Sequence, residues 1–229
     1  TKGRGHFSHR LAFGPEGSSH EGMLFISSGD RQIMHPAQTL DNNLGKIIRL
    51  HDDGRIPVDN PYADMGFPAN TIWTSGHRNV LGLSFAPNND LWANEMGPLH
   101  GDELNLISKG ENYGWPFVSE GNHYNGRHIP SHSTNDGFTP PVKYWVPTIA
   151  PSSLVFMPTT KDGNWSGNAV ITGLKSKAIF RLEIKNNQAI HQEKFYIGNR
   201  IRALTIGHDL TLWAIEDGRA GRLLKIIVE

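Results

Sequence analysis

One pattern of apolar strand, turn and second apolar strand occurs four times along the 229 residues, and this repeat limits the fold more than any other feature. The paired segments are residues 11–13 with 24–26, 83–85 with 91–93, 154–156 with 169–171, and 204–206 with 212–214. Period-two alternation indicates half-buried strands. The turns between the segments are rich in Gly, Asn, Asp and Pro, as turns require. We therefore expect an all-β protein.

A further segment of β-forming residues follows each pair, at residues 46–50, 103–107, 178–182 and 223–227. Four units of three or more strands, separated by roughly 50 to 70 residues, fit the blades of a β-propeller. The alternative is a β-sandwich whose segments are similar by accident. In a propeller, loops from different blades meet at the mouth of the axis, so the functional residues are expected there.

The composition excludes several classes of function. The 22 basic and 22 acidic residues balance, so neither a nucleic acid nor an anionic membrane is indicated as a partner. The 25 glycines and 14 prolines favour a turn-rich β protein over a helix bundle. Cysteine is absent, which excludes disulfides and thiolate chemistry. No apolar run reaches the roughly 18 residues that a transmembrane helix needs.

His6 and Asp30 form the first candidate constellation. His6 lies just before the strand that begins at Leu11, and Asp30 follows the strand that contains residues 24–26. The two side chains are therefore expected to meet at one end of a hairpin. A carboxylate beside an imidazole fixes its tautomer and raises its basicity, as a general base requires. A lone surface histidine is the alternative.

Two loops offer donors and acceptors for a ligand. Arg78 and Asn79, directly before the strand at Leu83, supply hydrogen-bond donors for a carboxylate or carbonyl oxygen, although a solvated loop would have the same composition. The acidic loop that contains Gly97 and Pro98 can turn backbone carbonyls outward. Calcium prefers such carbonyl and carboxylate oxygens, but the spacing matches no EF-hand.

A late basic group consists of Lys175, Arg200 and Arg202. With a period of two, the two arginines lie on the same side of their strand. Together with Lys175 from the preceding blade they predict a clamp for an anionic ligand. An exposed sheet edge that carries charges is the alternative.

Taken in order, these segments resemble the soluble quinoprotein glucose/sorbosone dehydrogenase family, which includes the bacterial aldose sugar dehydrogenases. The resemblance covers nearly the whole chain, and its motifs are specific as a set rather than singly. They are His6 with Arg10-Leu11 and Gly14-Pro15, Gly29-Asp30, Leu44-Gly45-Lys46 with Asp59-Asn60-Pro61, Gly76-His77-Arg78-Asn79, Gly97-Pro98, Asp102-Glu103, Asn112-Tyr113-Gly114-Trp115-Pro116, Pro147-Thr148, Ala150-Pro151-Ser152-Ser153, Lys175 and Arg200-Ile201-Arg202.

The resemblance implies a six-bladed propeller that holds pyrroloquinoline quinone (PQQ) at its axis. Its carboxylates and ortho-quinone would be contacted by Arg78, Asn79, Tyr124, Thr148, Lys175, Arg200 and Arg202. The carbonyl oxygens of Gly97 and Pro98 would hold a calcium ion that also binds the quinone. In some relatives a calcium site includes the residues that correspond to Glu103 and the carbonyl of Tyr113.

The same resemblance implies oxidation of an aldose at its anomeric carbon to a lactone. His6, oriented by Asp30, would take the hydroxyl proton while hydride passes to the quinone, and Arg78 would stabilise the negative charge on the quinone oxygen. Electrons would then pass to an acceptor other than oxygen, either a quinone or a redox protein. A monomer or homodimer in the periplasm or outside the cell is expected.

Two departures from the family pattern stand out. Met96 replaces a residue that is usually polar beside Gly97, which removes one expected hydrogen bond to the cofactor. Only about four of the six blades are present in residues 1–229, which we expect to be a single propeller domain that lacks its N-terminal blades. These blades would lie before Thr1 and would supply a further cofactor contact.

Two other functions are compatible with a propeller. One is a non-enzymatic extracellular module that uses its mouth to bind sugars or proteins; the joint presence of a base, a calcium loop and an anion clamp favours the enzyme. The other is a calcium-dependent lactonase or hydrolase. That chemistry needs several carboxylates converging on the metal, and few acidic residues lie at the appropriate strand ends.

Overall fold

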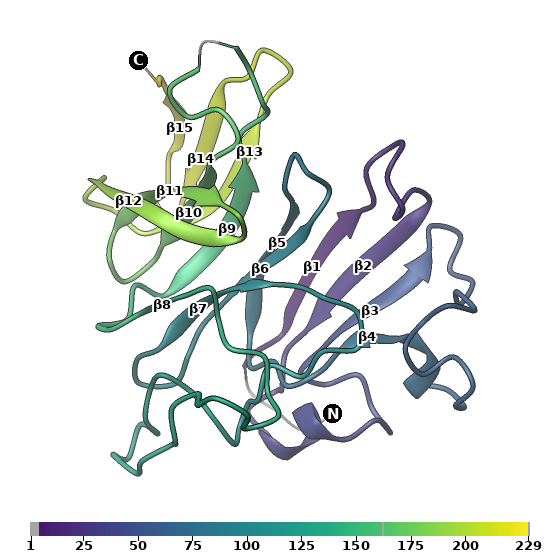
Figure 1. The fold of residues 1–229 in the computed structure, drawn as a ribbon. Helices are drawn as coiled ribbons and strands as arrows, with labels where there is room; N and C mark the ends of the chain where they lie inside the picture. The colour runs from purple at the N-terminus through teal and green to yellow at the C-terminus, as the bar shows by residue number, and fades with distance from the viewer. Residues whose placement is uncertain (1–4, 162, 229) are drawn as a thin grey trace.

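The computed structural model describes residues 5–161 and 163–228. Within these residues, fifteen strands form four antiparallel sheets, joined by loops and by the two short 3-10 helices η1 (His35–Gln38) and η2 (Ala69–Thr71) (Figure 1). The predicted all-β class is confirmed. Four separate sheets also differ from the two packed sheets of a β-sandwich. Neither helix of the described chain is long and apolar enough to cross a membrane.

The strands follow one another in chain order within each sheet. The first sheet contains β1 (Ser8–Phe13), β2 (Met23–Ser28), β3 (Lys46–His51) and β4 (Ile72–Thr74). The second contains β5 (Val80–Phe85), β6 (Leu91–Glu95), β7 (Asp102–Leu106) and β8 (Lys143–Trp145). The third contains β9 (Pro151–Phe156), β10 (Ala169–Gly173), β11 (Ala178–Lys185) and β12 (Gln188–Tyr196). The fourth contains β13 (Ile201–Ile206), β14 (Leu212–Glu216) and β15 (Leu223–Ile226).

All twelve predicted segments lie in strands, and two of them, 103–107 and 223–227, extend one residue beyond the end of their strand. The outer strands β4, β8 and β12 were missed. β4 and β8 have three residues each, too few for alternation to be recognised. β12 is long but largely exposed and polar, so its sequence carries no apolar pattern.

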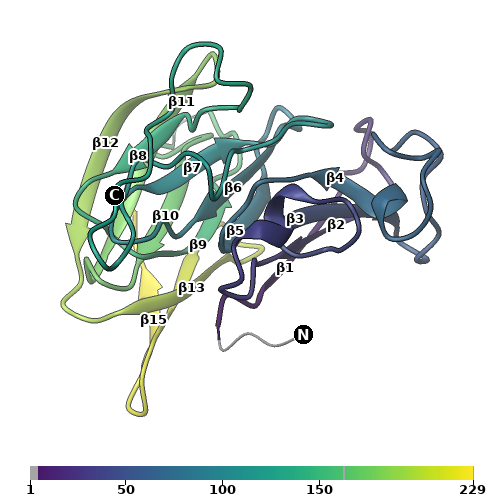
Figure 2. The ribbon, with the colours of Figure 1, turned by 90° about the horizontal axis from the view of Figure 1, so that it is seen from below.

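Successive sheets adjoin one another through their first strands. β1 contacts β5, β5 contacts β9, and β9 contacts β13. Figure 1 shows the sheets in chain order, from the purple first sheet to the yellow fourth, and Figure 2 shows them from below. Side chains join the inner strands, since the Ser27 hydroxyl donates to the Val80 carbonyl and the Leu204 amide donates to Ser153 Oγ. This arrangement is typical of propeller blades.

A hydrophobic core lies between each pair of neighbouring sheets. Phe25, which is fully buried, packs edge-on against Trp73 and Phe85 between the first and second sheets. Trp92 and Phe156 meet between the second and third sheets. A third core joins the third sheet to the fourth. The sheets therefore stack face to face, and their connecting loops remain at the ends of the strands.

Lys46 anchors the loop between β2 and β3. Its side chain is fully buried at the start of β3. Its ammonium nitrogen donates to the carbonyl oxygens of Pro36 (2.7 Å), Ala37 (3.0 Å) and Leu44 (2.8 Å). Burial lowers the pKa of Lys46 to about 7, and the charge of Asp41 offsets this only in part. The lysine therefore holds a loop together without a direct carboxylate partner in the part of the chain that the structure describes.

The lowered pKa of Lys46 predicts a pH-dependent stability. Between pH 7 and about 10.5 the unfolded chain binds more protons at this residue than the folded chain, so the free energy of unfolding should rise with pH, by roughly 1 kcal/mol per pH unit at most. Below pH 7 this contribution should be constant. Urea unfolding of the wild type and of Lys46→Met at pH 6, 7.5 and 9 measures it. An equal difference between the two proteins at all three pH values contradicts the prediction.

Candidate active site

His6 and Asp30 meet, as predicted. Nδ1 of His6 lies 2.6 Å from Oδ1 of Asp30, whose side chain is fully buried after the end of β2. Gly29 allows this approach, because a Cβ atom there would collide with the carbonyl oxygen of His6. His6 itself has a φ of 54°, and left-handed residues other than glycine occur often at functional sites.

The Asp30 carboxylate accepts two further hydrogen bonds. The indole Nε1 of Trp115 donates to Oδ2 (2.8 Å), and the Gln32 amide donates to Oδ1 (2.8 Å). Burial raises the pKa of Asp30, but the hydrogen bonds from His6, Gln32 and Trp115 outweigh this and leave the pKa below its usual value. The ionised carboxylate favours the His6 tautomer with a proton on Nδ1, so Nε2 is the nitrogen that can accept a proton. Trp115 lies in one of the family motifs, but its contact with Asp30 was not predicted.

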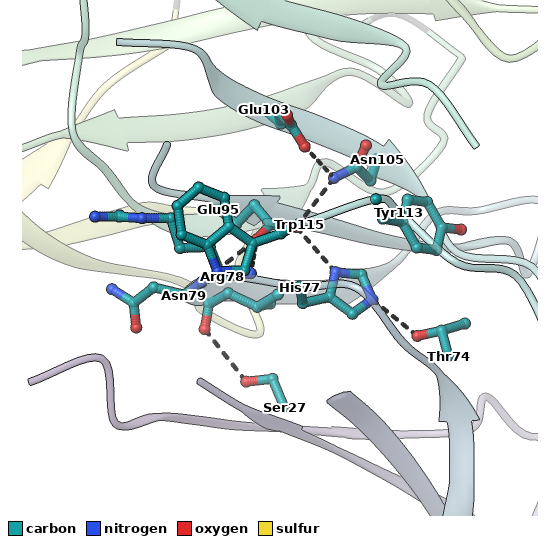
Figure 3. A network of polar contacts seen from close by, with 12 residues as sticks. Ser27, Thr74, His77, Arg78, Asn79, Glu95, Glu103, Asn105, Tyr113 and Trp115 are labelled. Carbon is teal, nitrogen blue, oxygen red and sulfur yellow. Dashed lines mark hydrogen bonds and ion pairs between the residues drawn. The ribbon is translucent and has the colours of Figure 1, made fainter. Parts of the chain in front are cut away.

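The Arg78 side chain lies close to the rings of Trp115, shown in Figure 3, and Tyr124. Its guanidinium lies 5.2 Å from the ring centroid of Trp115 and 5.7 Å from that of Tyr124. Nη1 donates to the carbonyl oxygens of Gly97 (2.6 Å) and Met96 (2.9 Å), and Nη2 donates to the Tyr124 hydroxyl (3.4 Å). Nε is buried and has no hydrogen-bond partner among the described residues. An unsatisfied buried donor on a charged group is costly and suits an anionic or carbonyl ligand.

The Arg78 loop lies directly beside the histidine pair. The Asp30 amide donates to the Arg78 carbonyl (2.9 Å). The buried Asn79 accepts a hydrogen bond from the Ser8 hydroxyl through Oδ1 (3.1 Å). The structure therefore brings His6, Asp30, Arg78 and Asn79 together at one end of the first two sheets.

The four predicted calcium residues line one small pocket. Gly97, Pro98, Glu103 and Tyr113 border it together with Arg78. Burial, and then the charge of nearby Glu95, raise the pKa of Glu103 well above its usual value. No cluster of three or more His, Cys, Asp or Glu side chains suited to a metal occurs in residues 5–161 and 163–228. A metal here would depend mainly on backbone oxygens, and that of Gly97 already accepts from Arg78.

The late arginines lie on the same side, as predicted, but they share a carboxylate. Arg200 Nε lies 2.9 Å and Arg202 Nη2 3.0 Å from the same oxygen of Asp217. Asp217 was missed in the sequence, because a single acidic residue after a strand is not distinctive. Arg10 is a further missed cation. It donates to the Ser152 carbonyl (3.2 Å), and burial and then the charge of Arg202 lower its pKa.

The remaining predicted contacts lie at the margins of this region. Lys175 is exposed in the turn between β10 and β11, where its amide donates to the Ile149 carbonyl (3.1 Å). The Thr148 hydroxyl donates to Asp102 Oδ2 (2.6 Å). Tyr124 is 72% exposed, and its hydroxyl accepts from Arg78. Neither Lys175 nor Thr148 is joined to Arg78 by a direct hydrogen bond in the described structure.

Comparison with known proteins gives consistent matches. The family model for glucose/sorbosone dehydrogenase matches residues 1–225. Aldose sugar dehydrogenase YliI of Escherichia coli is 36% identical over 226 residues, which cover 96% of this chain and 60% of that protein. Quinoprotein glucose dehydrogenase B of Acinetobacter calcoaceticus is 34% identical over 190 residues, 75% of this chain and 38% of that protein.

The solved structures agree with this match. The PQQ-bound form of aldose sugar dehydrogenase from Streptomyces coelicolor superposes with a TM-score of 0.77 and 30% identity, and the match covers all of this chain and 64% of that one. The chain thus spans less than two thirds of the length of these relatives. Because the family match extends over nearly all residues, the chain belongs to the glucose/sorbosone dehydrogenase family.

Proposed function

We propose that this protein oxidises aldose sugars at the anomeric carbon to lactones, with PQQ and calcium as cofactors. One observation carries the proposal. The His6–Asp30 pair lies beside the Arg78 loop, whose guanidinium has no carboxylate partner within the described residues. Oxidation of the sugar removes a proton and a hydride. A base can accept the proton, and a nearby cation can stabilise the negative charge that develops where the hydride is accepted. Family membership and the PQQ-bound relative support the same reaction.

The residues present fit an anionic quinone. PQQ, when bound, would supply the ortho-quinone that accepts hydride from the sugar. The buried, unsatisfied Nε of Arg78 and the side chain of Asn79 would bind one end of it. Arg200 and Arg202 would bind its carboxylates, together with Lys175, Thr148 and Tyr124. Asp217 holds both arginines in place and neutralises one charge of the pair, which leaves a net positive cluster.

The donor set around Gly97 suits calcium. Carbonyl and carboxylate oxygens are its preferred ligands, and Gly97, Pro98, Tyr113 and Glu103 offer both kinds in one pocket. A divalent cation would also offset the cost of ionising the buried Glu103. Calcium, when bound, would act as a Lewis acid. Arg78 would then share or release the Gly97 carbonyl, since two cations on one oxygen repel each other.

The proposed chemistry at the protein side is a proton transfer. His6 Nε2 would accept the proton of the anomeric hydroxyl, and Asp30 would stabilise the imidazolium that forms on the other side of the ring. Trp115 and the Gln32 amide keep Asp30 ionised and fixed in orientation. Arg78 would stabilise the negative charge that develops where hydride is accepted.

Several expectations about the whole protein stay predictions. These are a single six-bladed propeller domain, a location in the periplasm or outside the cell, a monomeric or homodimeric state, and an electron acceptor other than oxygen.

A dye-linked assay tests the proposal. The purified protein should reduce an artificial electron acceptor in the presence of an aldose. This rate should rise at least tenfold when PQQ and calcium are both added, and it should return to the basal level after chelation of calcium. If PQQ neither binds nor stimulates reduction, the enzyme is excluded and a sugar- or protein-binding propeller becomes the better assignment.

A further inference from the structure

Glu95 is a buried carboxylate that holds the backbone of the Arg78 loop (Figure 3). It ends β6 and is 3% exposed. Oε2 accepts from the amides of Arg78 (2.6 Å) and Asn79 (3.3 Å). Oε1 accepts from Nδ1 of His77 (2.9 Å) and from the side-chain amide of Asn105 (3.2 Å). Four donors thus converge on one carboxylate, and two of them belong to the main chain of predicted cofactor residues.

Asp102 holds the other side of the same region. It begins β7 and is 1% exposed. Oδ1 accepts from the Gly97 amide (3.0 Å). Oδ2 accepts from the Thr148 hydroxyl (2.6 Å) and from the amides of Ile149 (2.7 Å) and Ala150 (2.8 Å). Asp102 therefore joins the loop of the second sheet, residues 96–101, to the segment that leads into the third sheet.

Both carboxylates act on Arg78. Glu95 fixes its main chain through the amide. Asp102 fixes the peptide that joins Met96 to Gly97, since it binds the Gly97 N–H while Arg78 Nη1 binds the Met96 carbonyl of that same peptide. A planar peptide held at its N–H cannot turn its carbonyl freely. Arg78 is thus held at its main chain by Glu95 and at its guanidinium by the peptide that Asp102 fixes.

Neither carboxylate neutralises the charge that it positions. Within the described residues Arg78 forms no ion pair closer than 4.0 Å with any carboxylate, and its guanidinium donates only to carbonyl and hydroxyl oxygens. A direct ion pair would fix the side chain equally well, but it would reduce its attraction for an anion. Indirect support leaves the full positive charge available.

We propose that Glu95 and Asp102 are positioning residues that orient Arg78 for an anionic, quinone-type ligand without pairing with its charge. The proposal rests on the proposed function, because PQQ is the ligand whose affinity reports on Arg78. It goes beyond that function in assigning a role to two carboxylates through their hydrogen bonds to the Arg78 and Gly97 amides.

A double-mutant cycle on quinone binding tests the proposal. PQQ affinity is measured by fluorescence quenching in the presence of calcium for Glu95→Gln, Asp102→Asn, Arg78→Ala and the two double variants. Each carboxylate substitution should raise the Kd for PQQ about tenfold when Arg78 is intact. In the Arg78→Ala background the same substitution should raise the Kd less than about twofold. Equal losses in both backgrounds would show that the carboxylates do not act through Arg78 and would overturn the proposal.

Asp59→Asn is the matched control. Asp59 accepts two hydrogen bonds from the buried Arg49, both 3.0 Å, so its loss should also cost stability. The Kd for PQQ should change less than twofold in this variant. A tenfold increase of this Kd would mean that any loss of stability weakens PQQ binding, and it would contradict the positioning role.

Amide hydrogen exchange of the wild type distinguishes a failure of the positioning role from a failure of the proposed function. The amides of Arg78 and Gly97 should exchange at least a hundredfold more slowly than those of exposed loops, whether or not PQQ binds and whether or not the variants fold. Fast exchange at both amides overturns the positioning role. Absence of PQQ binding to the wild type instead overturns the proposed function, and slow exchange then still supports the two carboxylates as the groups that hold Arg78.

Discussion

Replacement of His6 by alanine should lower the rate of aldose oxidation at least a hundredfold while the Kd for PQQ changes less than about threefold. A positioned general base contributes roughly 10²- to 10⁴-fold to such a step. Nδ1 of His6 is bound to Asp30 at 2.6 Å, which leaves Nε2 to accept the proton. Turnover with saturating dye and quinone gives the rate, and fluorescence titration gives the affinity.

His9→Ala is the matched control for this prediction. His9 lies three residues away and is exposed, so its removal should leave both turnover and affinity near their wild-type values. Turnover of Asp30→Asn should lie between those of His6→Ala and His9→Ala. The amide preserves a contact with His6 but removes the charge that stabilises the imidazolium. Turnover of His6→Ala within threefold of the wild type would falsify the assignment of the base.

Most strands could be predicted because the alternation of their buried apolar residues is visible within a short segment and recurs along the chain. The segments around Leu83 and Leu91 alternate, pack their apolar side chains against the next sheet and end in turn residues, and each of these features is visible in a short window. β12 shows the limit of this reasoning. Its residues are mostly polar and exposed, and they form a strand because β11 presents an edge for pairing.

The histidine pair could be predicted for a similar reason. β1 and β2 are antiparallel neighbours, so the residue before one strand and the residue after the other meet at the same end. The rest of the site depends on distant contacts. Trp115 reaches Asp30 from 85 positions away, through a long loop with no periodic pattern. Glu95 and Asp102 bind mainly backbone amides, and sequence motifs do not report on these.

The same reasoning explains why the role of Arg78 could be only partly predicted. A basic residue in a loop before a strand is common, and its sequence neighbours suggest solvent exposure. The structure instead buries it to 5% exposure close to the rings of Trp115 and Tyr124, with backbone carbonyls as its main acceptors. Its proposed role rests on burial without a carboxylate partner among the described residues, which is a property of the folded chain.

Arg78→Gln should therefore reduce turnover by roughly 10²- to 10³-fold at saturating quinone, the usual effect of removing a group that stabilises developing charge. It should also weaken PQQ binding. Glutamine retains one donor for the Gly97 or Met96 carbonyl, so the loop is expected to stay in place. Arg78→Lys keeps the charge but cannot make all three contacts, and its turnover should lie between those of Arg78→Gln and the wild type.

Arg181→Gln provides the control, since Arg181 also lies near a tryptophan ring, 5.8 Å from the centroid of Trp165, but pairs directly with Glu193 at 2.8 Å. Its loss should not change quinone affinity. Ionic strength distinguishes the two arginines further. Because Arg78 has no ion pair within residues 5–161 and 163–228, the affinity of the wild type for PQQ should fall as salt is raised. This salt dependence should be weaker in Arg78→Gln but unchanged in Arg181→Gln. Equal salt dependence in all three proteins would mean that the Arg78 charge does not act on the ligand.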